Sequence, residues 1–301
     1  MRWQSRNPQG RVAYVNGRYL HHAQASVHIE DRGLQLGDSV YEVMAVVRGA
    51  LRDEEEHLDR LERSLREIRV AMPMSRGGLK FVFREVARRN RLRNGLIYLQ
   101  VTRGAFRRDH PIPSEIAKPT LILTAREVDR AASEQRKERG IKVVTRPDER
   151  WGRCDIKTPQ LLANLLAKTD ARKEGAYEAW LVDRDGFVTE GCSTNAWIVT
   201  AEGEIVTRAL SNAILPGVTR RVILEAAAAA QMKVVERRFT PEEASRAKEA
   251  FLSAATGACV PIVAIDGTKV GDGKPGSVTR RVQEIYEDWA RSHAEKAKSG
   301  A

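Results

Sequence analysis

The sequence contains few of the residues that mark secreted, membrane or metal-binding proteins. Only three cysteines occur in 301 residues, and Cys154, Cys192 and Cys259 are far apart and lack metal-ligand spacing with the histidines. No apolar run approaches the length that crosses a bilayer, and the N-terminal MRWQSRNPQGR contains no apolar segment resembling a signal peptide. These absences predict reduced thiols in a cytoplasmic protein, with no metal site and no membrane association.

Motifs of several common chemistries are also missing. There is no GxSxG elbow, no Gly-rich phosphate loop and no internal repeat. The 51 Lys+Arg against 40 Asp+Glu give a formal net charge of +11, which leaves a basic nucleic-acid-binding protein as a distant alternative. However, basic and acidic residues alternate, as in EEEHLDRLERSLREIR, and no aromatic-rich basic cluster accompanies them. We therefore interpret the charge as a solvated surface without a nucleic-acid partner.

The pattern of apolar residues predicts a mixed α+β fold. RVAYVNGRYL contains two short β-rich runs around Asn16-Gly17, which is a strong hairpin signal. Apolar residues at Leu58, Leu61 and Leu65 are three and four apart, which predicts a helix with one buried stripe.

The same pattern predicts two domains. The segment VDRAASEQRKERG is charged and poor in apolar residues, as is typical of a linker. We expect an N-terminal α/β domain over residues 1–125, a linker over 126–140, and a C-terminal α+β pseudo-barrel domain over 141–301.

One lysine lies in an unusual local sequence, RCDIKTPQLLANLLAK. Pro159 disfavours helical angles at Thr158, so the chain should arrive at Lys157 extended and enter a helix only afterwards. This placement at a strand-to-helix turn would point an amine into a pocket.

Three further segments are candidate ligand sites. In PGVTRR, a Pro-Gly turn before Val218 and Thr219 starts a helix whose free N–H groups suit an anion, the alternative being an ordinary N-cap. TEGCSTN places Glu190 where alternation predicts a pocket-facing carboxylate, the alternative being a surface loop. In VTRGAFRRDHPIP, Arg108 and His110 stand two apart, so both side chains would reach one carboxylate; the alternative is a solvated basic loop.

Together these segments indicate a pyridoxal-phosphate enzyme. Such an enzyme needs a lysine, a phosphate site, an acidic partner for the pyridine nitrogen and a site for the substrate carboxylate. The sequence also closely resembles the fold-type IV pyridoxal-phosphate aminotransferases, and among them the bacterial D-amino acid aminotransferases. The resemblance covers most of the chain, through DRGLQLGDSVYEV, EEHLDRL, IYLQVTRG, RCDIK, YEAWLVDRDGFVTEG, STN and LPGVTRR.

This resemblance implies roles for individual residues. Lys157 matches the lysine that bonds to the cofactor and moves a proton between substrate Cα and cofactor C4′, and Glu190 matches the carboxylate that keeps the pyridine nitrogen protonated. The other implied cofactor contacts are Arg60, Val218 and Thr219 for the phosphate, Ser193 beside the cofactor and Leu215 on its ring. The implied carboxylate-binding residues are Tyr41, Arg108 and His110.

The chain departs from the family pattern in two places. Where the family usually has a threonine in the phosphate loop, this chain contains Ala254-Ala255-Thr256, so either Thr256 takes that place or backbone N–H groups alone bind the phosphate. The loop residues Phe106, Arg107 and Asp109 also differ from the small or neutral residues expected there.

The resemblance implies a homodimer, in which this loop reaches the neighbour's active site, and transamination between a D-amino acid, D-alanine or D-glutamate, and a 2-oxo acid. The alternatives within the same fold are an (R)-amine aminotransferase, a branched-chain aminotransferase and an aminodeoxychorismate lyase.

Overall fold

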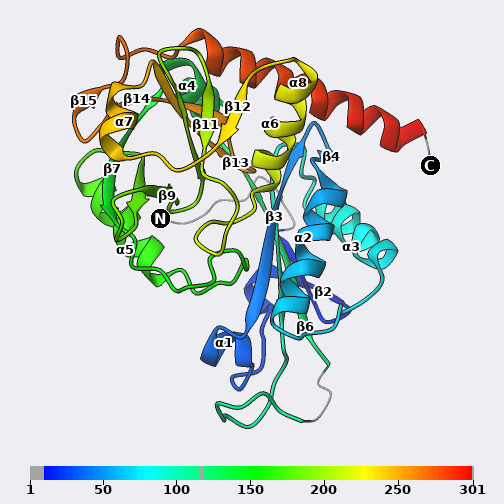
Figure 1. Cartoon of the computed structure of the whole chain (residues 1–301). Helices are drawn as coiled ribbons and strands as arrows, with labels where there is room; N and C mark the ends of the chain where they lie inside the picture. The colour runs from blue at the N-terminus through cyan, green and yellow to red at the C-terminus, as the bar shows by residue number, and fades with distance from the viewer. Residues whose placement is uncertain (1–9, 115–117, 300–301) are drawn as a thin grey trace. The chain divides into compact units, whose positions relative to one another are not determined.

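The computed structural model describes residues 10–114 and 118–299, and the chain divides into two compact units (Figure 1). The first unit contains the chain up to Asp129 together with Ile156–Gln160, and the second contains Arg130–Asp155 and the chain from Leu161 onward. Residues 1–9, in the segment predicted to lack a signal peptide, lie outside the described residues. No helix in the described ranges combines the length and the apolar character needed to cross a membrane.

The first unit is built on a six-stranded antiparallel sheet with the strand order β2-β1-β6-β5-β3-β4. The strands are β1 (Val12–Val15), β2 (Arg18–His21), β3 (Ser39–Val47), β4 (Ala50–Leu51), β5 (Gly95–Thr102) and β6 (Thr120–Glu127). The helices are the 3₁₀ turn η1 (His22–Gln24), α1 (Arg32–Leu36), α2 (Glu54–Glu67) and α3 (Arg76–Arg89).

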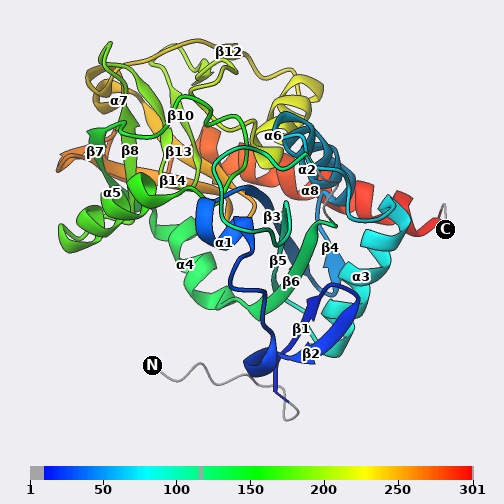
Figure 2. The same cartoon turned by 90° about the horizontal axis from the view of Figure 1, so that it is seen from below.

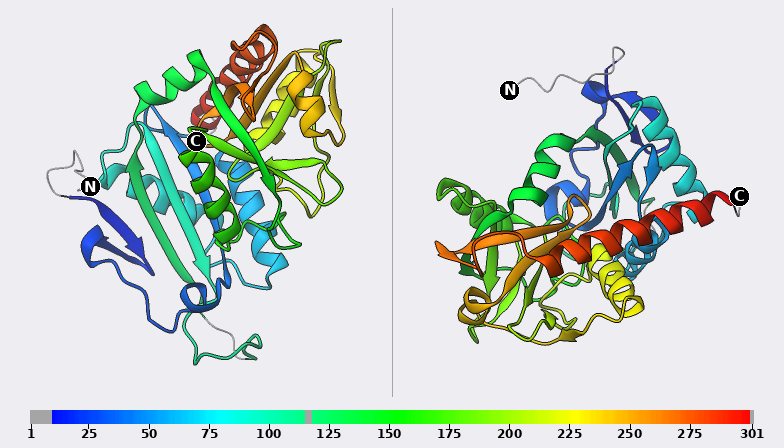
Figure 3. Two further views of the ribbon diagram at one scale, coloured as in Figure 1. Left: turned by 90° about the vertical axis from the view of Figure 1, so that its left-hand side faces the viewer. Right: turned by 90° about the horizontal axis from the view of Figure 1, so that it is seen from above.

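Local sequence explains the elements of this unit well. Strands β1 and β2 pair through the predicted turn, in which both Asn16 and Gly17 have positive φ, at 46° and 90°. The predicted stripe of α2 is buried, because Leu58, Leu61 and Leu65 are each at most 1% exposed. Helices α2 and α3 lie on one face of the sheet (Figure 3), so their apolar stripes and the strands form one core.

The second unit contains a nine-stranded mixed sheet with the order β12-β11-β10-β13-β14-β7-β8-β9, and β15 pairs with β14. The strands are β7 (Ile141–Pro147), β8 (Glu178–Val182), β9 (Val188–Gly191), β10 (Asn195–Val199), β11 (Ile205–Thr207), β12 (Val234–Glu236), β13 (Glu249–Ala254), β14 (Ala258–Ile265) and β15 (Thr268–Lys269). The helices are α4 (Arg130–Arg139), α5 (Leu162–Lys173), α6 (Val218–Ala229), α7 (Pro241–Arg246) and α8 (Ser277–Ser299).

The strands β9 and β10 contact each other although they are far apart in the sheet order, so the sheet bends round on itself. Trp180 and Trp197 are completely buried in its cores. Helices α6 and α8 pack against each other (Figure 2). The strands and helices of both units therefore form the α+β fold that the sequence predicts.

The segment predicted as a linker is not an extended connection. Residues 130–139 form helix α4, which packs against β14. None of its residues is buried, and this exposure explains the charged composition. A solvated helix and a linker have the same composition, so composition alone did not distinguish them.

Candidate active site

Lys157 lies in an irregular segment that belongs to the first unit. Ile156 is buried in the core of that unit, and the Tyr41 N–H donates to the Lys157 carbonyl at 2.9 Å. The predicted extended approach is wrong, because residues 154–156 form a turn and the Thr158 N–H donates to the Ile156 carbonyl at 2.8 Å. Pro159 restricts only the residue before it, and the chain bends earlier.

The structure brings Lys157 and Tyr41 together, as the predicted roles require. The Lys157 Nζ lies 4.3 Å from the centroid of the Tyr41 ring. Tyr41 stacks in turn on Tyr98, with ring centroids 5.5 Å apart. Burial raises the pKa of Tyr98 to about 12, and the nearby Tyr41 contributes, so Tyr98 stays neutral. The Lys157 amine thus lies over the face of one ring of a stacked aromatic pair.

Arg60, the predicted phosphate-binding arginine, is held by a buried carboxylate of its own unit. Its Nε and Nη2 donate to Oε1 and Oε2 of Glu42, both at 2.8 Å, and His57 Nδ1 lies 2.7 Å from Glu42 Oε2. Burial opposes the ionisation of Glu42, but the charges and hydrogen bonds of Arg60 and His57 together lower its pKa far below the ordinary range. The guanidinium plane of Arg60 is therefore fixed by a two-point ion pair.

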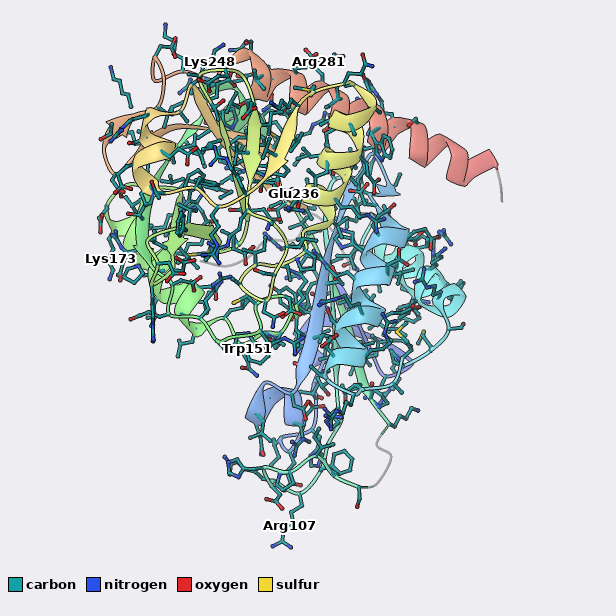
Figure 4. The ribbon with its side chains drawn as sticks, viewed as in Figure 1. Arg107, Trp151, Lys173, Glu236, Lys248 and Arg281 are labelled. Atoms are coloured by element: carbon teal, nitrogen blue, oxygen red, sulfur yellow. The ribbon has the colours of Figure 1, made fainter. Side chains whose placement is uncertain are left out.

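Arg108 and His110 lie in the loop between β5 and β6, and both are exposed. The loop projects from its unit, and Figure 4 shows Arg107 at its outer end with the side chain directed away from the rest of the unit. The His110 N–H donates to Asp109 Oδ1 at 2.7 Å. The two candidate residues are thus exposed on the loop.

Glu190 lies in strand β9 of the second unit, one residue before its end, and is the centre of a buried hydrogen-bond network. It is 5% exposed. Its Oε1 accepts from Arg150 Nη1 at 2.5 Å, its Oε2 accepts from Asn195 Nδ2 at 2.9 Å, and the Leu215 N–H lies 3.1 and 3.2 Å from the two oxygens. The predicted ring contact Leu215 therefore also contacts Glu190 through its backbone.

The charges around Glu190 are balanced to favour a cation. Arg150 also donates to Asp148, from Nε at 2.9 Å and from Nη2 at 2.7 Å. Burial opposes the ionisation of Asp148, but the hydrogen bonds and charge of Arg150 keep its pKa below the ordinary value. Burial raises the pKa of Glu190 from 4.5 to about 7, although Arg150 opposes this change. One arginine thus faces two carboxylates, and a protonated ring nitrogen would neutralise the cluster.

The start of helix α6 has the properties of an anion site. Its N-cap Gly217 provides no side-chain hydrogen bond, and within the described residues the buried hydroxyl of Thr219 has no hydrogen-bond partner. A Cβ on Gly217 would lie 2.0 Å from Asn195 Oδ1, so only glycine fits there. Asn195 thereby links this helix end to Glu190. N–H groups and a hydroxyl are the donors that a phosphate requires.

Two other predicted contacts lie in different surroundings. Ser193 is exposed and its hydroxyl contacts Lys168 Nζ at 2.6 Å and Glu178 Oε2 at 2.8 Å, neither of which is a hydrogen-bond partner of Glu190 among the described residues. Ala255 and Thr256 form the turn between β13 and β14, in which Thr256 is exposed.

The candidate residues therefore fall into two groups, one on each unit. Lys157, Tyr41, Arg60, Arg108 and His110 belong to the first unit. The others, from Glu190 to Thr256, belong to the second. The sequence reasoning missed Arg150. The only local sequence feature that points to Arg150 is the Asp-x-Arg spacing after β7. Its partner Glu190 is 40 residues away in the sequence.

Comparisons with known proteins show the family of the chain. The family model for amino-transferase class IV matches residues 39–265. The D-alanine aminotransferase of Bacillus licheniformis is 36% identical, with 93% of this chain and 98% of that protein covered. The D-alanine aminotransferase of Staphylococcus haemolyticus is 38% identical at the same coverage.

Solved structures with this fold include branched-chain amino acid aminotransferases. The Escherichia coli structure has a TM-score of 0.84 and 25% identity, covering 91% of this chain and 93% of that one. A second structure, of the T.th. enzyme with pyridoxamine 5'-phosphate, has a TM-score of 0.83 and 26% identity, covering 93% of each chain.

Proposed function

Because the chain belongs to the class IV aminotransferases, we propose that it transfers an amino group from a D-amino acid, D-alanine or D-glutamate, to a 2-oxo acid such as 2-oxoglutarate or pyruvate. The predicted family, fold and enzyme class are confirmed by these matches. The D-alanine aminotransferases matched along 93% of the chain support the D-amino acid as donor. The structural observation that carries the proposal is the buried Glu190, linked through Asn195 to a helix start at which, among the described residues, the buried Thr219 hydroxyl has no hydrogen-bond partner.

The cofactor that fits these residues is pyridoxal 5'-phosphate. The uncapped start of α6 and the orphan hydroxyl of Thr219 fit a phosphate, with Val218 at the first helical position and Ala255 and Thr256 in the turn after β13 as further contacts. The buried Glu190 would fit a protonated pyridine nitrogen, because the positive charge of that nitrogen would favour the carboxylate form that burial disfavours. When bound, pyridoxal phosphate supplies an aldehyde carbon for an amine and a ring that withdraws electrons from substrate Cα.

The protein's own residues then have separate tasks. Lys157 would hold the cofactor through its Nζ, and the same amine would serve as the base that takes the proton from substrate Cα. Glu190 keeps a proton on the ring nitrogen. Tyr41, Arg108 and His110 bind the α-carboxylate, so that Cα–H is aligned with Lys157. The donor would leave as a 2-oxo acid once water replaces its amino group, and a second 2-oxo acid would receive that amino group in the reverse sequence.

We also propose that the enzyme is a cytoplasmic homodimer that binds small amino and 2-oxo acids and no nucleic acid. The exposure of Arg108 and His110 on a projecting loop suits residues that complete a neighbour's site. The three cysteines form no disulfide, as in a reducing compartment. Sedimentation velocity tests the dimer, and a salt-dependent mobility-shift assay tests the absence of nucleic-acid binding.

Half-reaction spectra of the holoenzyme test the activity. We expect D-alanine and D-glutamate to convert the bound cofactor to its amine form faster than L-leucine or (R)-1-phenylethylamine does. The structural neighbours that are branched-chain aminotransferases make L-leucine the most informative competitor. Faster conversion by L-leucine or by the (R)-amine would identify one of the alternative activities, and conversion by none of them would contradict transamination.

A further inference from the structure

The motif Asp31-Arg32-Gly33 at the start of α1 is fastened to the end of strand β5. Asp31 Oδ2 accepts from the Thr102 hydroxyl at 3.0 Å, and its Oδ1 accepts from the Gly33 N–H at 2.8 Å. A Cβ on Gly33 would lie 2.4 Å from Thr102 Cγ2, so glycine is required for this approach. The Arg32 N–H donates to the Gly104 carbonyl at 2.9 Å. The motif thus fixes the chain where the loop carrying Arg108 begins.

The side chain of Arg32 then reaches the far part of that loop. Its Nη1 donates to the Asp109 carbonyl at 2.7 Å, and its Nη2 donates to the His110 carbonyl at 3.3 Å. Its Nε donates to Asp38 Oδ2 at 2.8 Å, and Arg32 is only 4% exposed. The planar guanidinium of Arg32 therefore donates to two consecutive carbonyls of the loop, and the Asp38 carboxylate in turn fixes the guanidinium.

The charges of Arg32, Asp38 and Arg103 explain why Arg32 needs the loop carbonyls as acceptors. Asp38 is shared with Arg103, which donates to it from Nε at 2.7 Å and from Nη2 at 2.9 Å and also to the carbonyls of Ile68 and Arg69. Two nearly buried guanidiniums therefore share one carboxylate, and backbone carbonyls must accept the remaining N–H groups. Releasing the loop would leave charged donors of Arg32 buried without partners, which is costly.

No other hydrogen bond among the described residues of this unit replaces the Arg32 contacts. Residues 107–114 are all described, and within the described part of the chain their only hydrogen bonds to the rest of the unit come from Arg32. The carbonyls that Arg32 holds belong to Asp109, which lies between Arg108 and His110, and to His110 itself. Arg32 therefore contacts the backbone directly at the residues assigned to the substrate carboxylate.

We propose that Arg32 is a positioning residue for substrate specificity, which fixes the backbone of Asp109 and His110 so that Arg108 and His110 face one α-carboxylate. This inference rests on the proposed function. Arg32 itself touches no substrate and acts through the loop. Removing it should therefore weaken the recognition of the carboxylate and leave the chemistry at Cα intact.

Two variants and a matched control test this role. Arg32→Gln removes the positive charge and the forked set of N–H donors, while Arg32→Lys retains the charge on a single compact ammonium group. Arg103→Gln is the control, because Arg103 shares Asp38 and a similar burial but does not contact residues 105–114.

The first measurement is hydrogen–deuterium exchange of the holoenzyme. In Arg32→Gln we expect the two hydrogen-bonded amides of this segment, those of Phe106 and His110, to exchange about tenfold faster, with Arg32→Lys intermediate and Arg103→Gln like the wild type at both amides. Unchanged exchange in Arg32→Gln would overturn the proposal. If Arg32→Gln fails to fold, the same comparison of Arg32→Lys with Arg103→Gln decides.

The second measurement is D-alanine kinetics. Arg32→Gln should lower kcat/KM about tenfold, mainly through KM, and should add little in an Arg108→Ala background because both changes remove the same recognition. If the losses in kcat/KM of Arg32→Gln and Arg108→Ala multiply in the double variant, the role of Arg32 is merely structural and the proposal is overturned. The same holds if Arg103→Gln loses as much kcat/KM as Arg32→Gln. A wild-type holoenzyme inactive with every D-amino acid would instead refute the proposed function. The exchange data would still show whether Arg32 fixes the loop.

Discussion

Replacing Glu190 by glutamine should change how the stability of the cofactor-free protein depends on pH. Burial raises the pKa of Glu190 from 4.5 to about 7. Between these values the folded protein binds a proton that the unfolded chain has lost, so raising the pH lowers the free energy of unfolding. The stabilising contribution is complete below about pH 4.5 and is lost as the pH rises through about 7.

The magnitude follows from the same pKa values. The difference between 4.5 and about 7, at about 1.4 kcal/mol for each pH unit, corresponds to about 3 kcal/mol. Glutamine has the same shape and does not titrate. From about pH 4 to about pH 8, the wild type should therefore lose about 3 kcal/mol relative to Glu190→Gln.

Urea unfolding followed by tryptophan fluorescence measures this difference. Every tryptophan among the described residues, including the buried Trp180 and Trp197, lies in the second unit with Glu190, so the signal reports on the right unit. Arg150→Gln removes the charge that opposes the rise in pKa, so its pH-dependent loss should extend to higher pH. A difference between wild type and Glu190→Gln that is constant with pH would refute the reasoning.

Further predictions address the other candidate residues. Borohydride reduction of the holoenzyme followed by peptide mapping should place the pyridoxyl label on Lys157, and a label on another lysine would defeat that assignment. Arg108→Ala should lower kcat/KM for D-alanine about tenfold to a hundredfold and that for (R)-1-phenylethylamine far less, since a charge-assisted contact contributes about 1.5 to 3 kcal/mol; equal losses would mean a structural loop. Gly33→Ala should lower the free energy of unfolding by about 1 to 3 kcal/mol because its Cβ would meet Thr102, whereas the control Gly77→Ala, with nothing within 4 Å, should be neutral or stabilising.

Glu190→Gln also tests catalysis. The variant should fold and bind the cofactor but transaminate slowly, because an amide does not keep the ring nitrogen protonated. Wild-type turnover in this variant would remove Glu190 from its proposed role.

Features that depend on neighbouring residues were determined by the sequence alone. The hairpin at Asn16-Gly17 needs only two residues that tolerate positive φ, and the stripe of α2 needs only a spacing of three and four. The combination of local motifs along the chain, RCDIK among them, identified the family, which the comparisons confirm. The chain geometry before Lys157 was not determined in this way, because Pro159 acts only on the residue that it follows.

Only the tertiary structure decided which charged residues hold the candidate site residues in place. Arg150 contacts Glu190 across 40 residues of sequence, and Arg32 contacts the Asp109 carbonyl across 77. In a chain with 51 lysines and arginines, no spacing rule separates these two from arginines on the surface. Burial makes the difference, since a charge without water must find its acceptors in the folded chain, and those acceptors become neighbours only when the strands and loops come together.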